Sequence, residues 1–205
     1  MIGVLDYGVG NINAFLRIFH SQNISAMPIV SAGDFELVDK VILPGVGAFD
    51  VAMTKLNNSG LRDGLDNAVL NTNMPLLGVC IGMHMLGKYS EEGSLDGLNY
   101  IGGCTKKIPT HTLNERILLP HMGWNDVSNI GDNNIWVGIN LSEGFYFLHS
   151  YMFVPDCQHS VIGTSEYAGI FASAVNVSNI YGFQFHPEKS LFNGIQLLTN
   201  FAGRN

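Results

Sequence analysis

Pro75-Leu76-Leu77-Gly78-Val79-Cys80-Ile81-Gly82 carries the strongest fold signal in the sequence. Its apolar residues predict a buried strand over residues 75–79, and the glycines that flank Cys80 let the backbone turn sharply into a helix running to about Lys88. Such a strand-to-helix turn exposes the cysteine sulfur at its tip, and the start of a helix favours a thiolate through the helix dipole. Taken alone, the pattern fits a buried structural cysteine equally well.

Short apolar strands followed by loops or helices also occur before this stretch. Residues 2–5 and 41–43 are apolar runs that end in glycine-containing loops, and residues 12–20 carry apolar side chains at helical spacing. The alternation predicts an α/β fold with a mainly parallel central sheet and helices on both faces. In the C-terminal half, the pattern predicts additional antiparallel strands over residues 145–148, 170–177 and 180–185, and a last helix over residues 194–201.

The composition indicates a compact globular protein. A chain of 205 residues, 46% of them hydrophobic, fits one domain over residues 1–205. Its 10 Lys and Arg against 17 Asp and Glu give a net charge of −7, which does not suit binding to the backbone of a nucleic acid. No apolar run approaches the length of a membrane span. We therefore expect a cytoplasmic protein without nucleic-acid or membrane partners.

The cysteines and histidines indicate no cofactor. Cys80, Cys104 and Cys157 are an odd number in separate contexts, which argues against a disulfide framework, and we interpret the last two as structural. The histidines lack ligand spacing and the chain has no phosphate-binding loop, so no metal or organic cofactor is expected. His121 is interpreted as a structural histidine, and the Glu91-Glu92 pair as solvated loop charge.

A histidine and a carboxylate lie two residues apart in Phe183-Gln184-Phe185-His186-Pro187-Glu188-Lys189-Ser190. His186 can take the proton of the Cys80 thiol, and Glu188 can fix the tautomer of the imidazole and stabilise its protonated form. His-Pro-Glu alone is more often a surface turn. Together with the glycine-flanked cysteine, it predicts a catalytic triad of Cys80, His186 and Glu188.

Pro44-Gly45-Val46-Gly47 follows the second apolar run directly. The glycines around Val46 permit unusual backbone angles, which can turn an amide N–H toward a carbonyl oxygen that becomes negative in a transition state. A plain Pro-Gly turn is the alternative interpretation.

The order and spacing of Pro-Gly-Val-Gly, Gly-Val-Cys-Ile-Gly-Met and Phe-His-Pro-Glu-Lys-Ser resemble the class I (triad) glutamine amidotransferases, which have a flavodoxin-like fold. Three further segments resemble the glutaminase subunits of imidazole glycerol phosphate synthases within that family. They are Asp6-Tyr7-Gly8-Val9-Gly10-Asn11, Pro120-His121-Met122-Gly123-Trp124-Asn125 and Tyr146-Phe147-Leu148-His149-Ser150-Tyr151.

The resemblance implies a role for further residues. The thiolate would attack the carboxamide of L-glutamine, with the oxyanion held by the amide N–H groups of Val46 and Ile81. Substrate contacts are implied at Gly47, His84, His149, Ser150 and Tyr151. His84 departs from the family, which usually has glutamine there, and an imidazole cannot present the paired groups of an amide. A packed helix residue is the alternative interpretation of His84.

The resemblance also implies a partner. Asn11, Trp124, Tyr146 and Lys189 are similar to the face that docks onto a (β/α)8-barrel synthase subunit in a heterodimer, although Trp124 also fits simple core packing. The implied function is a glutaminase that supplies ammonia for formation of imidazole glycerol phosphate and AICAR in histidine biosynthesis. The alternative keeps the chemistry but supplies ammonia to a sugar amidotransferase of surface polysaccharide biosynthesis. A catalytically silent regulatory subunit is a third possibility, against which the intact triad argues.

Overall fold

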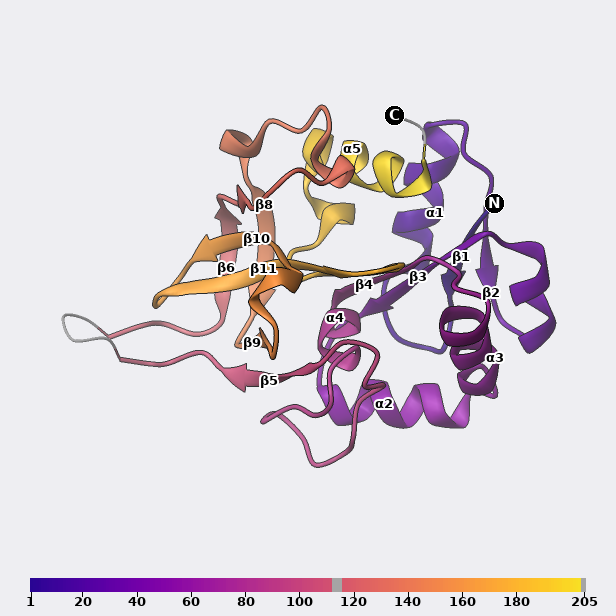
Figure 1. Cartoon of the computed structure of the whole chain (residues 1–205), viewed down its shortest axis with the longest axis horizontal. Helices are drawn as coiled ribbons and strands as arrows, with labels where there is room; N and C mark the ends of the chain where they lie inside the picture. The colour runs from indigo at the N-terminus through magenta and orange to yellow at the C-terminus, as the bar shows by residue number, and fades with distance from the viewer. Residues whose placement is uncertain (112–115, 204–205) are drawn as a thin grey trace.

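The computed structural model describes residues 1–111 and 116–203. Its centre is an eight-stranded sheet with the strand order β2-β1-β3-β4-β12-β11-β10-β7 (Figure 1). The strands are β1 (Ile2–Leu5), β2 (Ala26–Ile29), β3 (Lys40–Gly45), β4 (Leu76–Cys80), β7 (Ser128–Asn129), β10 (Val161–Glu166), β11 (Ile170–Val177) and β12 (Ile180–Phe183). From β2 to β12 the neighbours are parallel, and from β12 to β7 they are antiparallel.

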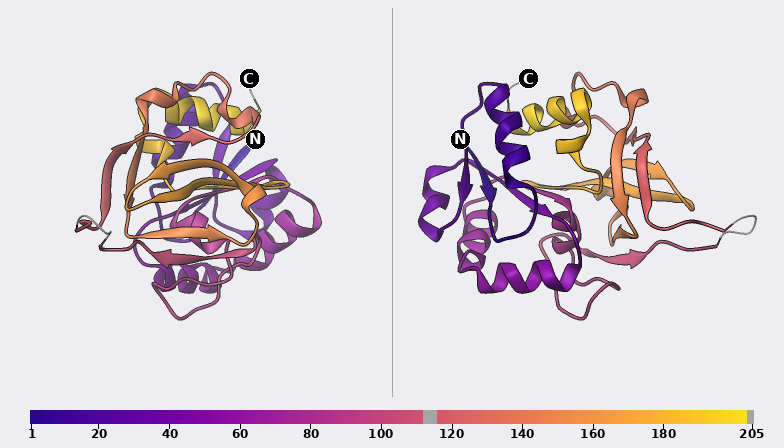
Figure 2. Two further views of the ribbon diagram at one scale, coloured as in Figure 1. Left: turned by 60° about the vertical axis from the view of Figure 1, so that its left-hand side comes forward. Right: turned by 180° about the vertical axis from the view of Figure 1, so that it is seen from behind.

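Helices cover both faces of this sheet. Helices α1 (Ile12–Ser21) and α5 (Leu191–Ala202) lie on one face, and α2 (Phe49–Asn58), α3 (Arg62–Asp66) and α4 (Ile81–Met85) lie on the other (Figures 1 and 2). Short helices complete the connections: η1 (Ala32–Leu37), η2 (Asn67–Asn71), η3 (Asn134–Trp136), η4 (Leu141–Glu143), η5 (Gln158–Ser160) and η6 (Pro187–Lys189). The predicted α/β fold class, with its mainly parallel sheet and its antiparallel strands in the C-terminal half, is confirmed.

Two smaller antiparallel sheets lie beside the C-terminal end of β4. One pairs β5 (Gly103–Lys107) with β9 (Tyr151–Pro155), and the other pairs β6 (His121–Asn125) with β8 (Phe145–His149). The chain therefore passes from one small sheet to the other at Ser150. This corner becomes a wall of the site described below.

The predicted boundaries differ from the structure at three places. The helix after Cys80 ends at Met85 instead of Lys88, because the carbonyls of residues 86–88 accept hydrogen bonds from the loop of residues 97–101. Strand β12 ends at Phe183, two residues before the predicted end. Helix α5 begins at Leu191, three residues earlier than the periodicity indicates.

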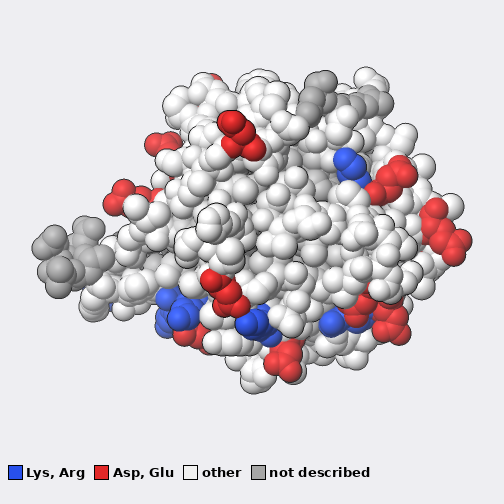
Figure 3. Space-filling model, viewed as in Figure 1, with Lys and Arg blue, Asp and Glu red and all other residues white. Residues whose placement is uncertain are grey.

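Surface charges are mixed in sign, and the helices are short. On the face drawn in Figure 3, the few basic side chains lie among acidic ones and do not gather into a patch. None of the helices within the described residues combines the length and hydropathy that crossing a bilayer requires.

The turn at Cys80 is packed tightly against β3. Gly45 of β3 pairs with Cys80 of β4, so the start of α4 passes directly over the end of β3. A Cβ atom added to Gly82 would lie 2.0 Å from the Leu43 carbonyl oxygen, and one added to Gly45 would lie 2.5 Å from the Gly82 amide nitrogen. Both contacts are with backbone, which cannot rotate away as a side chain does. The two glycines are therefore required by the close approach of α4 to the sheet.

We expect Gly82→Ala to lower the free energy of unfolding by about 3 kcal/mol, because overpacking against rigid backbone displaces the whole turn. Gly33→Ala is the matched control, since the nearest atom to its added Cβ is the Ser31 Oγ at 4.0 Å. Urea denaturation of both variants measures the difference. Equal stability of the two variants would contradict the tight packing of α4 on β3.

Candidate active site

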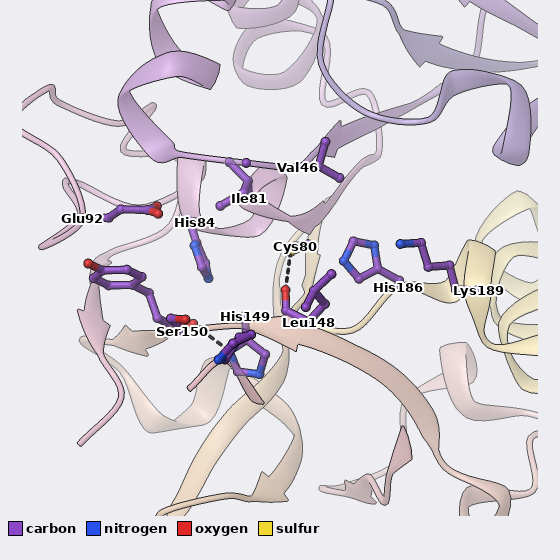
Figure 4. A pocket seen from close by; sticks show the side chains of 13 residues that line it. Val46, Cys80, Ile81, His84, Glu92, Leu148, His149, Ser150, His186 and Lys189 are labelled. Carbon is purple, nitrogen blue, oxygen red and sulfur yellow. Dashed lines mark hydrogen bonds between the residues drawn. The ribbon is translucent and has the colours of Figure 1, made fainter. Parts of the chain in front are cut away.

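A cavity of about 340 Å³ opens beside the C-terminal end of β4 (Figure 4). Parallel α/β sheets commonly bind ligands at this edge. The cavity brings together ten of the fourteen predicted site residues, which come from four separate parts of the chain. Its lining comprises Val46, Gly47, Cys80, Ile81, His84, Glu92, Pro120, Leu148, His149, Ser150, Tyr151, His186 and Lys189.

Cys80 has the backbone of a nucleophile elbow. Its φ of 54° and ψ of −110° are rare for a residue with a side chain, and such strain is common at functional sites. The residue is 4% exposed, and its Sγ lies 3.8 Å from the Leu148 carbonyl oxygen. The turn therefore holds the sulfur at the floor of the cavity, as the sequence predicts.

His186 and Glu188 form a buried pair beside Cys80. The His186 Nδ1 lies 2.8 Å from Glu188 Oε1, with the two side chains only 2% and 4% exposed. The His186 amide donates to the Tyr146 carbonyl and the Ser190 hydroxyl donates to the His186 carbonyl, which fixes the backbone of the histidine. The geometry thus places a base next to the thiol and a carboxylate behind the base.

The charge of His186 is set by these two neighbours. Burial alone would lower the pKa of the imidazole, yet hydrogen bonds and negative charge from Cys80 and Glu188 outweigh it and raise the pKa to about 10. A protonated imidazole beside a sulfur is an arrangement that holds a thiolate ready for attack. The Glu188 Oε2 has no hydrogen-bond partner within the described residues, so only one carboxylate oxygen is used.

His84 lies in the wall of the cavity with its polar atoms turned away from solvent. Its Nε2 lies 2.8 Å from the Gln184 Oε1, and its Nδ1 is buried without a partner in the described part of the chain. Burial lowers the pKa of this imidazole to about 4, so it is neutral. The structure therefore combines both interpretations of His84, a packed helix residue whose ring lines the cavity. Its role as a substrate contact stays a prediction.

The predicted oxyanion-hole residues flank the thiol. Val46 is 44% exposed at the end of β3, and the following Gly47 has a φ of 87°, which a side chain would disfavour. Ile81 is the first residue of α4 and is 6% exposed. Figure 4 shows both side chains on the α4 side of the cavity, across from Leu148 and His149.

Four predicted residues lie outside the cavity lining. Glu188 is behind His186, whereas Trp124 and Tyr146 form an edge-to-face pair with ring centroids 6.5 Å apart. Trp124 is 50% exposed, so it is not a core residue. The Lys189 ammonium lies 5.6 Å from the centre of the Tyr146 ring, and this lysine also lines the cavity. Asn11 caps α1, which contacts η6 and thus the segment of Lys189.

Sequence reasoning missed two features of the site. Glu92 is in the cavity wall, where it accepts from the Phe49 amide at 3.0 Å, so its interpretation as solvated loop charge was wrong. Burial raises the pKa of its carboxyl. Leu191 and Phe192 are 67% and 80% exposed and form a second hollow with Trp124. The sequence signal that could have indicated this second hollow is the apolar pair directly after the His-Pro-Glu-Lys-Ser motif.

The described residues hold no group of three or more His, Cys, Asp or Glu side chains that could bind a metal ion.

Known proteins share the family pattern and the fold of this chain. Residues 11–203 match the family model of class I glutamine amidotransferases. The fold is similar to a crystal structure of a glutamine amidotransferase, with a TM-score of 0.69 and 17% identity over 98% of both chains. It is also similar to a chain in the structure of PurLQS from Thermotoga maritima, with a TM-score of 0.70 and 14% identity over 98% of this chain and 97% of that one.

Curated relatives match almost the whole chain. The imidazole glycerol phosphate synthase subunit HisH of Leptospira interrogans is 44% identical over 98% of this chain and 99% of its own length. The HisH of Bdellovibrio bacteriovorus is 42% identical over the same shares. A Pseudomonas aeruginosa relative named HisH 2 is 43% identical over 98% of both chains. The chain belongs to the class I glutamine amidotransferases, in the family that includes these HisH subunits.

We expect the His186 imidazole to stay protonated up to about pH 10 in the parent protein, because Cys80 and Glu188 raise its pKa. Cys80→Ser removes an ionisable neighbour, so the pKa of His186 should fall while the Glu188 contact is kept. Titration of the histidine ring signals by NMR measures both values. An unchanged His186 pKa in the variant would contradict the thiolate–imidazolium pairing.

Proposed function

We propose that this chain is the glutaminase subunit of an imidazole glycerol phosphate synthase, and that it acts in the cytoplasm in histidine biosynthesis. The observation that carries the proposal is the buried Cys80, His186 and Glu188 group at the floor of a cavity beside β4. The names of relatives that match 98% of this chain support the pathway. They do not favour the alternative of a sugar amidotransferase in polysaccharide biosynthesis.

The reaction follows from the charge state of the triad. The Cys80 thiolate attacks the side-chain carboxamide carbon of L-glutamine, and the His186 imidazolium gives its proton to the departing nitrogen. Ammonia leaves and a glutamyl thioester remains. Water then attacks the thioester while His186 takes its proton, which releases glutamate and restores the thiolate. Glu188 stabilises the imidazolium through both steps.

The tetrahedral intermediates need donors for the oxyanion. The amide N–H groups of Ile81, next to the nucleophile, and Val46, across from α4, are the donors that we propose. The exposure of Val46 and the positive φ of Gly47 support a segment that can adjust its peptide direction.

Glutamine carries an ammonium group and a carboxylate group on its α-carbon, and the cavity has residues that can bind each of them. The Glu92 carboxylate offers a counter-charge to the substrate ammonium group, and Gly47, Ser150 and Tyr151 lie in the wall where backbone and hydroxyl groups can meet the carboxylate. The His84 Nε2 is already paired with Gln184, so it is not available to the substrate. His84 therefore contributes the surface of its ring to the cavity wall.

The surface around Lys189 fits a protein partner. Trp124, Leu191 and Phe192 are exposed apolar side chains beside the Tyr146–Lys189 pair, and aromatic residues commonly dominate interfaces. We propose that this face binds a (β/α)8-barrel synthase subunit, which forms imidazole glycerol phosphate and AICAR with the ammonia that it receives. Because Lys189 also lines the cavity, the partner would lie next to the place where ammonia is released.

We expect Cys80→Ala to abolish glutamate release from the complex of this chain with its synthase partner. Val46→Pro removes one amide N–H and should lower kcat by about 10²–10³, whereas Val46→Ala keeps the N–H and should stay near the parent. Steady-state glutamate release measures each rate. Parental activity of Cys80→Ala would refute the thioester mechanism, and equal rates of the two Val46 variants would refute the donor.

We expect Trp124→Ala to weaken binding of the synthase subunit by about 30-fold, which is typical of a central aromatic contact. Leu70→Ala is the control, because Leu70 is also a large apolar side chain, 55% exposed, but lies in η2, outside the hollow that Trp124 lines. Calorimetric titration with the partner gives both affinities. Equal affinities of the two variants would place the interface elsewhere.

A further inference from the structure

Two buried histidines and an asparagine form a continuous chain of hydrogen bonds behind the cavity wall. His149 Nδ1 lies 2.8 Å from the Tyr151 carbonyl oxygen, and His149 Nε2 lies 2.9 Å from His121 Nδ1. His121 Nε2 in turn lies 3.1 Å from Asn125 Nδ2. His121 and His149 face each other directly across the β6–β8 pair, so the two strands set this contact. The triad does not use these residues.

The donor or acceptor role is fixed at both ends of this chain of hydrogen bonds. These two ends determine which ring nitrogen of each histidine carries a hydrogen. The Tyr151 carbonyl only accepts, so His149 Nδ1 carries a hydrogen. At the other end, the Asp126 amide donates to Asn125 Oδ1 and Asn125 Nδ2 donates to the Glu166 carbonyl, which sets the orientation of the amide. Asn125 Nδ2 therefore donates to His121 Nε2.

The order of protons follows from these two ends. His121 Nε2 accepts, so its Nδ1 carries the hydrogen and donates to His149 Nε2, and both imidazoles are neutral. Burial lowers the pKa of His149 to about 3 and that of His121 to about 4, which agrees with neutral rings. The Tyr167 ring stacks on His121 with centroids 4.1 Å apart and holds the ring plane.

The His149–Tyr151 end of this chain of hydrogen bonds forms part of the cavity wall. His149, Ser150 and Tyr151 all line it, and at Ser150 the backbone leaves the β6–β8 sheet for the β5–β9 sheet. The bond from His149 to the Tyr151 carbonyl spans that corner. In Figure 4 His149 and Ser150 lie together on the wall across from Ile81.

We propose that His121 and Asn125 are positioning residues for glutamine binding, which act by holding the His149 ring through its Nε2 and thereby fixing the Ser150 corner. The proposal rests on the proposed glutaminase function for its kinetic consequence. Without a donor at position 121, His149 Nε2 is a buried acceptor without a partner, and the ring that bonds to the Tyr151 carbonyl is held from one side only.

Two variants of His121 separate the hydrogen bond from the stacking. His121→Phe keeps an aromatic ring against Tyr167 but loses the donor, and His121→Asn loses the ring but keeps an N–H near the Nδ1 position. In the complex with the synthase partner, we expect His121→Phe to raise KM for glutamine about tenfold with kcat little changed, since this is the typical effect of one lost hydrogen bond. His121→Asn should return KM close to the parent value.

Two kinetic results would contradict the proposal. An unchanged KM in His121→Phe, or an equal rise of KM in both variants, would overturn the proposal. If His121→Phe does not fold, ¹⁵N NMR of the parent chain decides: an Nδ1–H tautomer at His121, which can donate to His149 Nε2, supports the proposal, and an Nε2–H tautomer at His121 overturns it. A parent complex that hydrolyses no glutamine would refute the proposed function, while the tautomer would still be measured on the chain itself.

Discussion

The close approach of Gly82 to the Leu43 carbonyl is the constraint on which the site depends. Because α4 starts directly over the end of β3, Cys80 must adopt a positive φ to connect β4 to the helix. Such a conformation costs about 1–3 kcal/mol and persists only where the surrounding packing enforces it. The apolar core below the turn supplies that packing, as Leu43 and Leu77 are fully buried. The position of the sulfur is thus determined by backbone contact and not by side-chain choice.

The parallel half of the fold was predictable because its signals are local. Buried parallel strands are short apolar runs, and the glycines around Cys80 mark the turn in the sequence itself. The same locality explains why His186 and Glu188 were found, since they are two residues apart. The corner at Ser150 depends on two sheets with distant partners, and Glu92 reaches the cavity only because its loop folds back onto α2. The spacing of residues in the sequence does not indicate the contacts at Ser150 or at Glu92.

Four buried histidines lie in or directly behind the wall of one cavity, and their neighbours decide the charge of each. His84, His121 and His149 bond to neutral groups, so burial dominates and lowers their pKa values. Only His186 has two partners that can be anionic, and its pKa rises instead. A second imidazolium beside it would compete for the thiolate. The neutral state of His149, which feels the charge of His186, therefore keeps the positive charge of the cavity at the one ring that touches the sulfur.

The segment from His186 to Phe192 connects this chemistry to the surface. Within seven residues it presents the base, the buried carboxylate, a lysine at the cavity mouth and two exposed apolar side chains, while Ser190 ties its backbone to that of β8 through Tyr146. Because η6 runs almost directly into α5, the partner that we propose would contact Phe192 in the same segment that orients His186. Docking of that partner and proton transfer by His186 would then involve one short segment of the chain.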